Sequence, residues 1–164
     1  MLEVRVEHDI GCDEARLWAL LADPEFQTRM LTEGLGYPAP KIIETSKTET
    51  EQRWVMEVTP NIKLPAAVSR VVGGSLGYTE RATCVPAERR MSLEHVTNAL
   101  GSKLSLRGEI STVPRGDGLT RVSVFHIEAR VFGVGGALER AVEGNIRESL
   151  DRTARFLRAC VGTP

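Results

Sequence analysis

The 164-residue sequence has few cysteines, no excess of charge of either sign and no long apolar run. The cysteines are Cys12, Cys84 and Cys160, and an odd number without a CxxC pair argues against a disulfide framework or a zinc site. Basic residues number 21 and acidic residues 22, so the net charge of −1 gives no bulk attraction to nucleic acid or to an anionic membrane. Because no window approaches the ~18 consecutive apolar residues of a membrane span, we expect no integral association with a membrane.

The opening residues alternate charged and apolar side chains, whereas a secretory signal needs a continuous apolar run. We therefore expect a cytoplasmic protein with reduced cysteines. With 41% hydrophobic and 26% charged residues, the composition is close to the globular average. A chain of this length buries roughly 70% of its unfolded surface. That is enough for one stable domain over residues 1–164 without disulfides, metal or cofactor.

Hydrophobic periodicity predicts one strand, two short helices, six strands and one long helix, in that order. Residues 2–10 alternate apolar and mostly charged side chains, which indicates a half-buried strand. Asp13 is placed to cap the first helix, and Asp23 with Pro24 ends it and begins the second. The six further strands are predicted over residues 41–48, 51–59, 76–85, 89–97, 103–113 and 119–132. Residues 62–72 read as a short amphipathic helix or an irregular edge segment, and residues 137–160 have the spacing of a long helix.

The order of these elements indicates how they pack. Strands in hairpin succession favour an antiparallel sheet. The sheet and the final helix carry the two large apolar faces, so they must cover each other. The prediction is an α+β fold in which a seven-stranded curved antiparallel sheet wraps around a long C-terminal helix, with two short helices after the first strand. A helix across such a twisted sheet leaves space at its ends, which is a natural cavity for a small molecule.

This order resembles the helix-grip fold of the START-like (SRPBCC) superfamily, which includes the birch-pollen-allergen type, polyketide cyclases and lipid-transfer START domains. The resemblance covers the whole chain and rests on two segments besides the opening strand. Residues 13–24 (DEARLWALLADP) form a helix that runs into Asp-Pro, and residues 132–139 (FGVGGALE) lead into the last helix. These segments look most like an uncharacterised bacterial branch. The resemblance implies binding of lipids, steroids, polyketides or proteins, and in a few members catalysis of cyclisation or dehydration.

The leading hypothesis is a binding module for a hydrophobic or amphipathic small molecule, such as a lipid, an isoprenoid or a polyketide-like ring system. The oligomeric state stays open. The candidate ligand-binding residues are large side chains on strand positions and part of a polar strip on the last helix: Trp54, Met56, Tyr78, Met91, His95, Phe125, Asn145 and Ser149. Core packing explains the strand residues equally well. The strip continues to Thr153 and faces either the cavity or solvent.

Two other functions stay open. A cyclase or dehydratase-type enzyme needs an acid/base pair facing the cavity, for which Tyr78, Glu80, His95 and Arg107 are the candidates. A protein-interaction domain of the chaperone-activator kind would instead have a collapsed, filled interior. A cavity with converging titratable groups would favour the enzyme.

A hydrolase motif in the sequence lacks the surrounding elements that it requires. Residues 73–77 (GGSLG) match the G-x-S-x-G nucleophile elbow, and Ser75, Asp117 and His126 follow the order of a hydrolase triad. The elbow requires a strand before the serine and a helix after it. The order predicted here is the reverse, so a glycine-rich turn is the preferred interpretation.

Neither phosphate nor metal binding is predicted. Residues 133–136 (GVGG) satisfy no phosphate-loop pattern and are interpreted as a joint before the last helix. His8, His95 and His126 do not stand at metal-ligand spacing on one predicted element. We expect each of them to be an ordinary hydrogen-bonded side chain, with His95 the best placed of the three for ligand contact.

Overall fold

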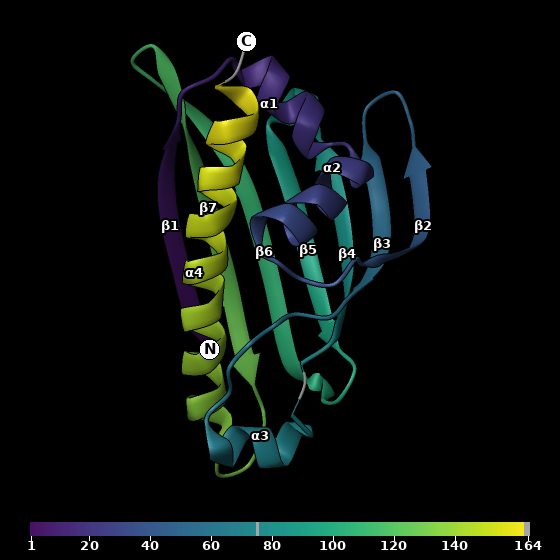
Figure 1. The fold of residues 1–164 in the computed structure, drawn as a ribbon, viewed down its shortest axis with the longest axis vertical. Helices are drawn as coiled ribbons and strands as arrows, with labels where there is room; N and C mark the ends of the chain where they lie inside the picture. Colours follow the sequence, from purple (N-terminus) through teal and green to yellow (C-terminus); the bar gives the residue numbers. More distant parts are fainter. Residues whose placement is uncertain (75, 163–164) are drawn as a thin grey trace.

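The computed structural model describes residues 1–74 and 76–162 (Figure 1). Its elements, in chain order, are β1 (Leu2–Ile10), α1 (Glu14–Leu21), α2 (Pro24–Arg29), the π-helical turn η1 (Met30–Gly34), β2 (Lys41–Lys47), β3 (Gln52–Val58), α3 (Ala66–Val72), β4 (Tyr78–Val85), the 3-10 turn η2 (Pro86–Glu88), β5 (Arg90–Thr97), β6 (Gly101–Arg115), β7 (Gly118–Ala129) and α4 (Gly135–Val161). The predicted order of elements is confirmed. The segment over residues 62–72, predicted as a short helix or an irregular edge segment, contains the helix α3.

One antiparallel sheet holds all seven strands in the order β1-β7-β6-β5-β4-β3-β2. The first strand pairs with the last, so β1 closes one edge and β2 the other. Figure 1 shows α4 running along the β1 and β7 side, α1 and α2 at one end of the sheet, and α3 at the other end. The sheet therefore grips the long helix, as the element order predicted.

The two short helices begin where the sequence places their caps. Asp13 accepts a hydrogen bond from the backbone N–H of Arg16 at 3.2 Å, and Asp23 accepts one from Glu25 at 3.0 Å. A side-chain oxygen in this position satisfies a backbone donor that the first helical turn leaves free. Pro24 occupies the first turn of α2, where its missing N–H costs nothing.

Several boundaries differ from the prediction, and left-handed residues accompany two of the differences. β5 begins at Arg90 rather than Arg89, because Arg89 adopts the left-handed conformation, with φ of 54°, that closes η2. β6 and β7 extend to the Arg115–Gly118 pair, which leaves only two residues for the hairpin turn, with Gly116 at φ of 59°. β7 ends at residue 129, before the predicted end at residue 132, and α4 begins two residues earlier than predicted.

The core consists of two clusters of buried side chains that meet in the middle of the sheet. The upper cluster lies under α1, α2 and η1 and includes Trp54, Met56 and Met91. The lower cluster lies under the first half of α4 and includes Phe125 and Ile146. The buried stripe of α4 recurs every three or four residues, as helical spacing requires: Leu138, Val142, Ile146, Leu150, Ala154, Leu157 and Val161. Among the described residues, no helix is both long and apolar enough to cross a membrane.

Candidate functional site

A cavity of about 110 Å³ lies where the two clusters meet, between the inner face of the sheet and α4. Its apolar wall is formed by Leu35, Ile62, Leu76, Leu104, Leu106, Phe125, Val142 and Ile146. Its polar groups come from Tyr37, Tyr78, His95, Thr97, Asn145 and Ser149. An apolar chamber with a few polar groups is the usual composition of a small-molecule site.

A hydrogen-bonded group of side chains from three neighbouring strands supports one wall, which Tyr78 and His95 line. Glu80 on β4 accepts a hydrogen bond from Trp54 Nε1 at 2.9 Å through Oε1. Its second oxygen, Oε2, lies 2.9 Å from His95 Nε2 on β5. Glu80 and His95 are register partners in an uninterrupted pairing of β4 with β5, so their side chains lie on the same face of the sheet. This is the inner face, because Glu80 is buried and His95 lines the cavity. The ring of Tyr78 stacks on that of His95, with centroids 4.3 Å apart and 20° between the planes.

This environment fixes the ionisation of two of these groups. Burial alone would raise the pKa of Glu80, but the hydrogen bond and charge of His95 and the hydrogen bond from Trp54 outweigh it and lower the pKa. Burial raises the pKa of the Tyr78 phenol well above its ordinary value, and the negative charge of Glu80 adds to the effect. At neutral pH a carboxylate therefore lies behind this wall, next to a neutral phenol that lines the cavity.

Two hydroxyl groups mark other parts of the cavity. Tyr37, in the loop after η1, has its hydroxyl 3.4 Å from Ser149 Oγ on α4. Thr97 is 7% exposed, and its Oγ1 is buried without a hydrogen-bond partner among the described residues. Leaving a buried hydroxyl unpaired costs free energy, and the Thr97 side chain is one of those that line the cavity.

Five of the eight candidate ligand-binding residues line the cavity: Tyr78, His95, Phe125, Asn145 and Ser149. Trp54, Met56 and Met91 point inward as well, but they pack in the upper cluster and do not line this cavity. Trp54 instead supports the wall through its bond to Glu80.

The polar strip of α4 faces the sheet. Asn145 and Ser149 reach the cavity, and Thr153 accepts a hydrogen bond from Arg121 Nη1 at 3.1 Å.

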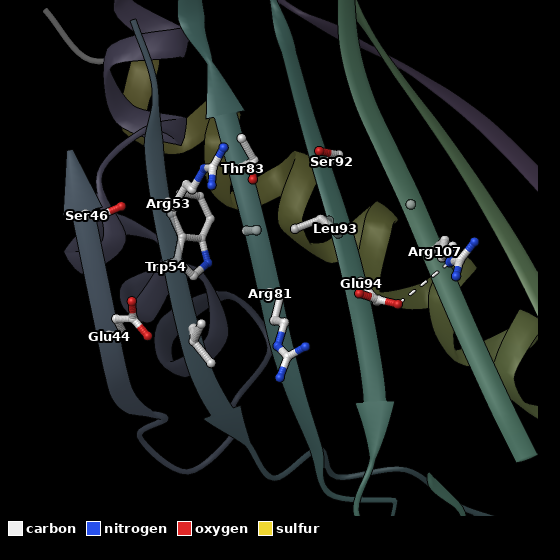
Figure 2. A pocket seen from close by; sticks show the side chains of 13 residues that line it. Glu44, Ser46, Arg53, Trp54, Arg81, Thr83, Ser92, Leu93, Glu94 and Arg107 are labelled. Atoms are coloured by element: carbon white, nitrogen blue, oxygen red, sulfur yellow. Dashed lines mark ion pairs between the residues drawn. The ribbon is translucent and has the colours of Figure 1, made fainter. Parts of the chain in front are cut away.

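Arg107, a candidate for the acid/base pair, does not face the cavity. Its side chain is 73% exposed on the outer face of β6, with Nε 3.8 Å from Glu94 Oε1 (Figure 2). Successive residues of a strand point to opposite faces, and Leu104 and Leu106 face inward. Of the four proposed acid/base groups, Tyr78, Glu80 and His95 therefore converge, and Arg107 does not.

A second hollow, of about 580 Å³, lies on the opposite face of the sheet over β2 to β6 (Figure 2). Its walls carry the charged side chains of Glu44, Arg53, Arg81, Glu94 and Arg107, with serine and threonine between them. The hollow is wide and open to solvent, and most of its side chains are charged or polar. The inner cavity is smaller, but it combines apolar walls with buried polar groups.

A buried arginine that contacts α4 near its middle was not predicted from the sequence. Arg121 on β7 is 2% exposed and donates from Nη2 to the Leu150 carbonyl at 2.7 Å. The same nitrogen lies 3.2 Å from His8 Nδ1, and His8 Nε2 lies 2.7 Å from Asp151 Oδ1. Burial, together with the positive charge of Arg158, lowers the pKa of Arg121 to about 10. This network fixes α4 against β1 and β7, away from the cavity wall.

The remaining sequence motifs do not form a site. Ser75 lies outside the described residues. Asp117 lies in the β6–β7 turn, at the end of the sheet opposite to α3 (Figure 1). The side chain of His126 is on the outer face, with Nδ1 3.7 Å from Glu3 Oε2. No three His, Cys, Asp or Glu side chains gather as a metal site within residues 1–74 and 76–162.

Phe125 forms the floor of the cavity because a glycine faces it. Gly108 on β6 is its register partner, and the phenyl ring lies directly over the glycine. A Cβ atom at position 108 would come within 2.3 Å of Phe125 Cε1.

Comparison with solved structures identifies the class of fold. The protein TTHA0849 from Thermus thermophilus superposes with a TM-score of 0.68 at 17% identity, over 98% of this chain and 97% of that one. A START superfamily protein from Mycobacterium smegmatis gives 0.58 at 14% identity, over 98% and 97%. The di-domain ARO/CYC BexL from the BE-7585A biosynthetic pathway gives 0.66 at 16% identity, with all of this chain covering 48% of that chain. The fold is thus the START-like helix-grip fold that the sequence resembles.

The family follows from the sequence itself. A family model described as protein of unknown function (DUF2505) matches residues 5–161, so the chain belongs to that family. A search of curated proteins found no match.

Proposed function

We propose that the protein binds a small, largely apolar molecule in the cavity between β4–β7 and α4. The observation that carries this proposal is a cavity lined by aliphatic and aromatic side chains and by Thr97, whose buried hydroxyl has no hydrogen-bond partner among the described residues. A wall group that lacks a partner in the free protein gains one from a polar ligand atom. The ligand is therefore amphipathic, with one polar end.

The size of the cavity limits which ligands it can hold. A volume of about 110 Å³ is of the order of the ~150 Å³ apolar cavity known to bind benzene. It accommodates about one aromatic ring, or one end of a larger molecule. A single ring, or one ring of a larger polyketide-like molecule, fits this space better than an extended lipid or isoprenoid chain. The chamber also supports small-molecule binding over the protein-interaction alternative, which predicted a filled interior.

Thermal unfolding with a panel of single-ring compounds tests this proposal. A ligand at 100 times its dissociation constant stabilises the folded state by about 2.7 kcal/mol, which for a chain of this size raises the melting temperature by about 5–11 °C. Val142→Phe places a ring in the cavity and should abolish the shift. Glu148→Phe adds the same ring on the exposed side of α4 and should preserve it. A panel without any shift, or equal shifts in both variants, would refute binding at this site.

A further inference from the structure

The hydrogen bonds around Glu80 leave one nitrogen of His95 free for a ligand. Both carboxylate oxygens of Glu80 are used, one by Trp54 Nε1 and the other by His95 Nε2. A carboxylate only accepts hydrogen bonds, so Nε2 carries the proton in this pair. In the neutral ring, Nδ1 is then an acceptor. Within the described residues Nδ1 makes no hydrogen bond, and His95 lines the cavity.

The carboxylate also places a negative charge next to His95. The side chains of His95 and Glu80 are 13% and 10% exposed, so water screens their interaction weakly. A buried carboxylate that holds one imidazole nitrogen fixes the tautomer and stabilises the imidazolium that forms when the other nitrogen takes a proton. The stacked ring of Tyr78 keeps the imidazole plane in place.

A hydrogen-bond donor accompanies this acceptor. Thr97 follows His95 by two residues on β5, and both side chains line the cavity. The Thr97 hydroxyl is buried and has no partner among the described residues. An anionic oxygen in the cavity would have the protonated His95 and the Thr97 hydroxyl as its two donors.

We propose that the cavity selects a single-ring ligand with an acidic hydroxyl, a phenol or an enol, and holds it as the anion paired with protonated His95. The ligand O–H bond breaks, its electron pair stays on the ligand oxygen, and the proton forms a bond to Nδ1. If His95 is already protonated, the ligand anion enters from solution and the same ion pair results. This inference rests on the proposed small-molecule function and names its ligand chemistry.

The test compares 4-nitrophenol with nitrobenzene, which has the same ring and nitro group but no hydroxyl. The nitrophenolate anion absorbs visible light at wavelengths where neutral nitrophenol does not. At a pH where free nitrophenol is mostly neutral, titration with the protein should produce the phenolate band in proportion to binding. Nitrobenzene should bind at least about tenfold more weakly, because it leaves His95 and Thr97 without the polar partner.

Glu80→Gln isolates the role of the carboxylate. Trp54 Nε1–H requires an oxygen, so the amide oxygen of Gln faces Trp54 and the amide NH₂ group faces His95. Nε2 then becomes the acceptor and Nδ1 carries the proton, which removes the acceptor from the cavity. This variant should bind nitrobenzene as the unmodified protein does and show no phenolate band. Glu94→Gln, the same change on the outer face of β5, should retain the full band.

The outcomes separate the two proposals. Binding of nitrophenol in its neutral form, equal affinity for nitrobenzene, or a phenolate band that survives in Glu80→Gln would overturn the present inference and leave small-molecule binding intact. Failure of both probes to bind would count against the proposed function as well. If circular dichroism shows that Glu80→Gln does not fold, His95→Gln replaces it. Its amide can still donate to Glu80, and the inference again requires that the band be lost.

Discussion

Thr97→Val should make the protein more stable and a poorer binder. The threonine hydroxyl is buried at the cavity wall without a hydrogen-bond partner among the described residues. An unsatisfied buried polar group costs about 1–3 kcal/mol. Valine has the same shape and suits a strand equally well, so little else changes. We expect the free energy of unfolding to rise by about 1 kcal/mol and the melting temperature by about 2–4 °C.

Ser123→Ala is the matched control. Ser123 lies on the inner face of β7, is 0% exposed, and also has a buried hydroxyl without a partner in the described part of the chain. It does not line the cavity. Its replacement should also stabilise the fold, but it should leave the affinity for 4-nitrophenol unchanged, whereas Thr97→Val should lower that affinity several-fold.

Urea unfolding and a binding titration on the two variants check this reasoning. A loss of about 1 kcal/mol or more in Thr97→Val would show that the hydroxyl is satisfied in solution. Equal loss of affinity in both variants would show that the effect does not come from the cavity wall.

Three more predictions concern ionisation, reactivity and motion. The pKa of Glu80 is lower in the folded state than its ordinary value, so its contribution to stability is present above about pH 4.3 and is lost as the pH falls through the folded pKa. Urea unfolding from pH 3 to pH 7 should show a shallower loss in Glu80→Gln; identical slopes would contradict the assignment. Burial raises the pKa of Cys84 to about 11, so iodoacetamide at pH 8 should label Cys84 only on unfolding and after Cys160, as peptide mass mapping can show. Hydrogen exchange should be fast across residues 62–74 and slow across residues 142–157, with ligand protecting the former, because Ile62 lines the cavity beside the short α3 whereas α4 buries a long apolar stripe. The reverse order of exchange would make α4 the moving element.

Most of the fold could be predicted because periodicity reports which face of an element is buried. The alternation of β1 and the three- or four-residue spacing of α4 are strong patterns, and Asp13 and Asp23 mark helix starts by their own chemistry. The ends of β5 and β7 were less predictable. The start of β5 depends on a single left-handed residue, Arg89, which periodicity does not report.

The site was only partly predictable, because a cavity is a property of register and packing. Tyr78 and His95 could be chosen as large inward residues, but their meeting at Glu80 depends on the pairing of β4 with β5. Tyr37 comes from an irregular loop without any periodic pattern. The choice of Arg107 as a cavity-facing residue could have been avoided, since it follows the inward-facing Leu106 on the same strand and therefore points outward.

Gly108 determines where the Phe125 ring lies and therefore how much space the cavity has. The Phe125 ring lies against the sheet only because residue 108 has no side chain, and a single methyl group there would lie within 2.3 Å of the ring and force it toward α4. The capacity of the chamber is therefore set by a residue that is not among those lining it. Family members with alanine or glycine at this one position would accept guests of different size while keeping every ligand-contacting side chain the same. An engineer could resize the chamber in the same way, without altering the groups that recognise the guest.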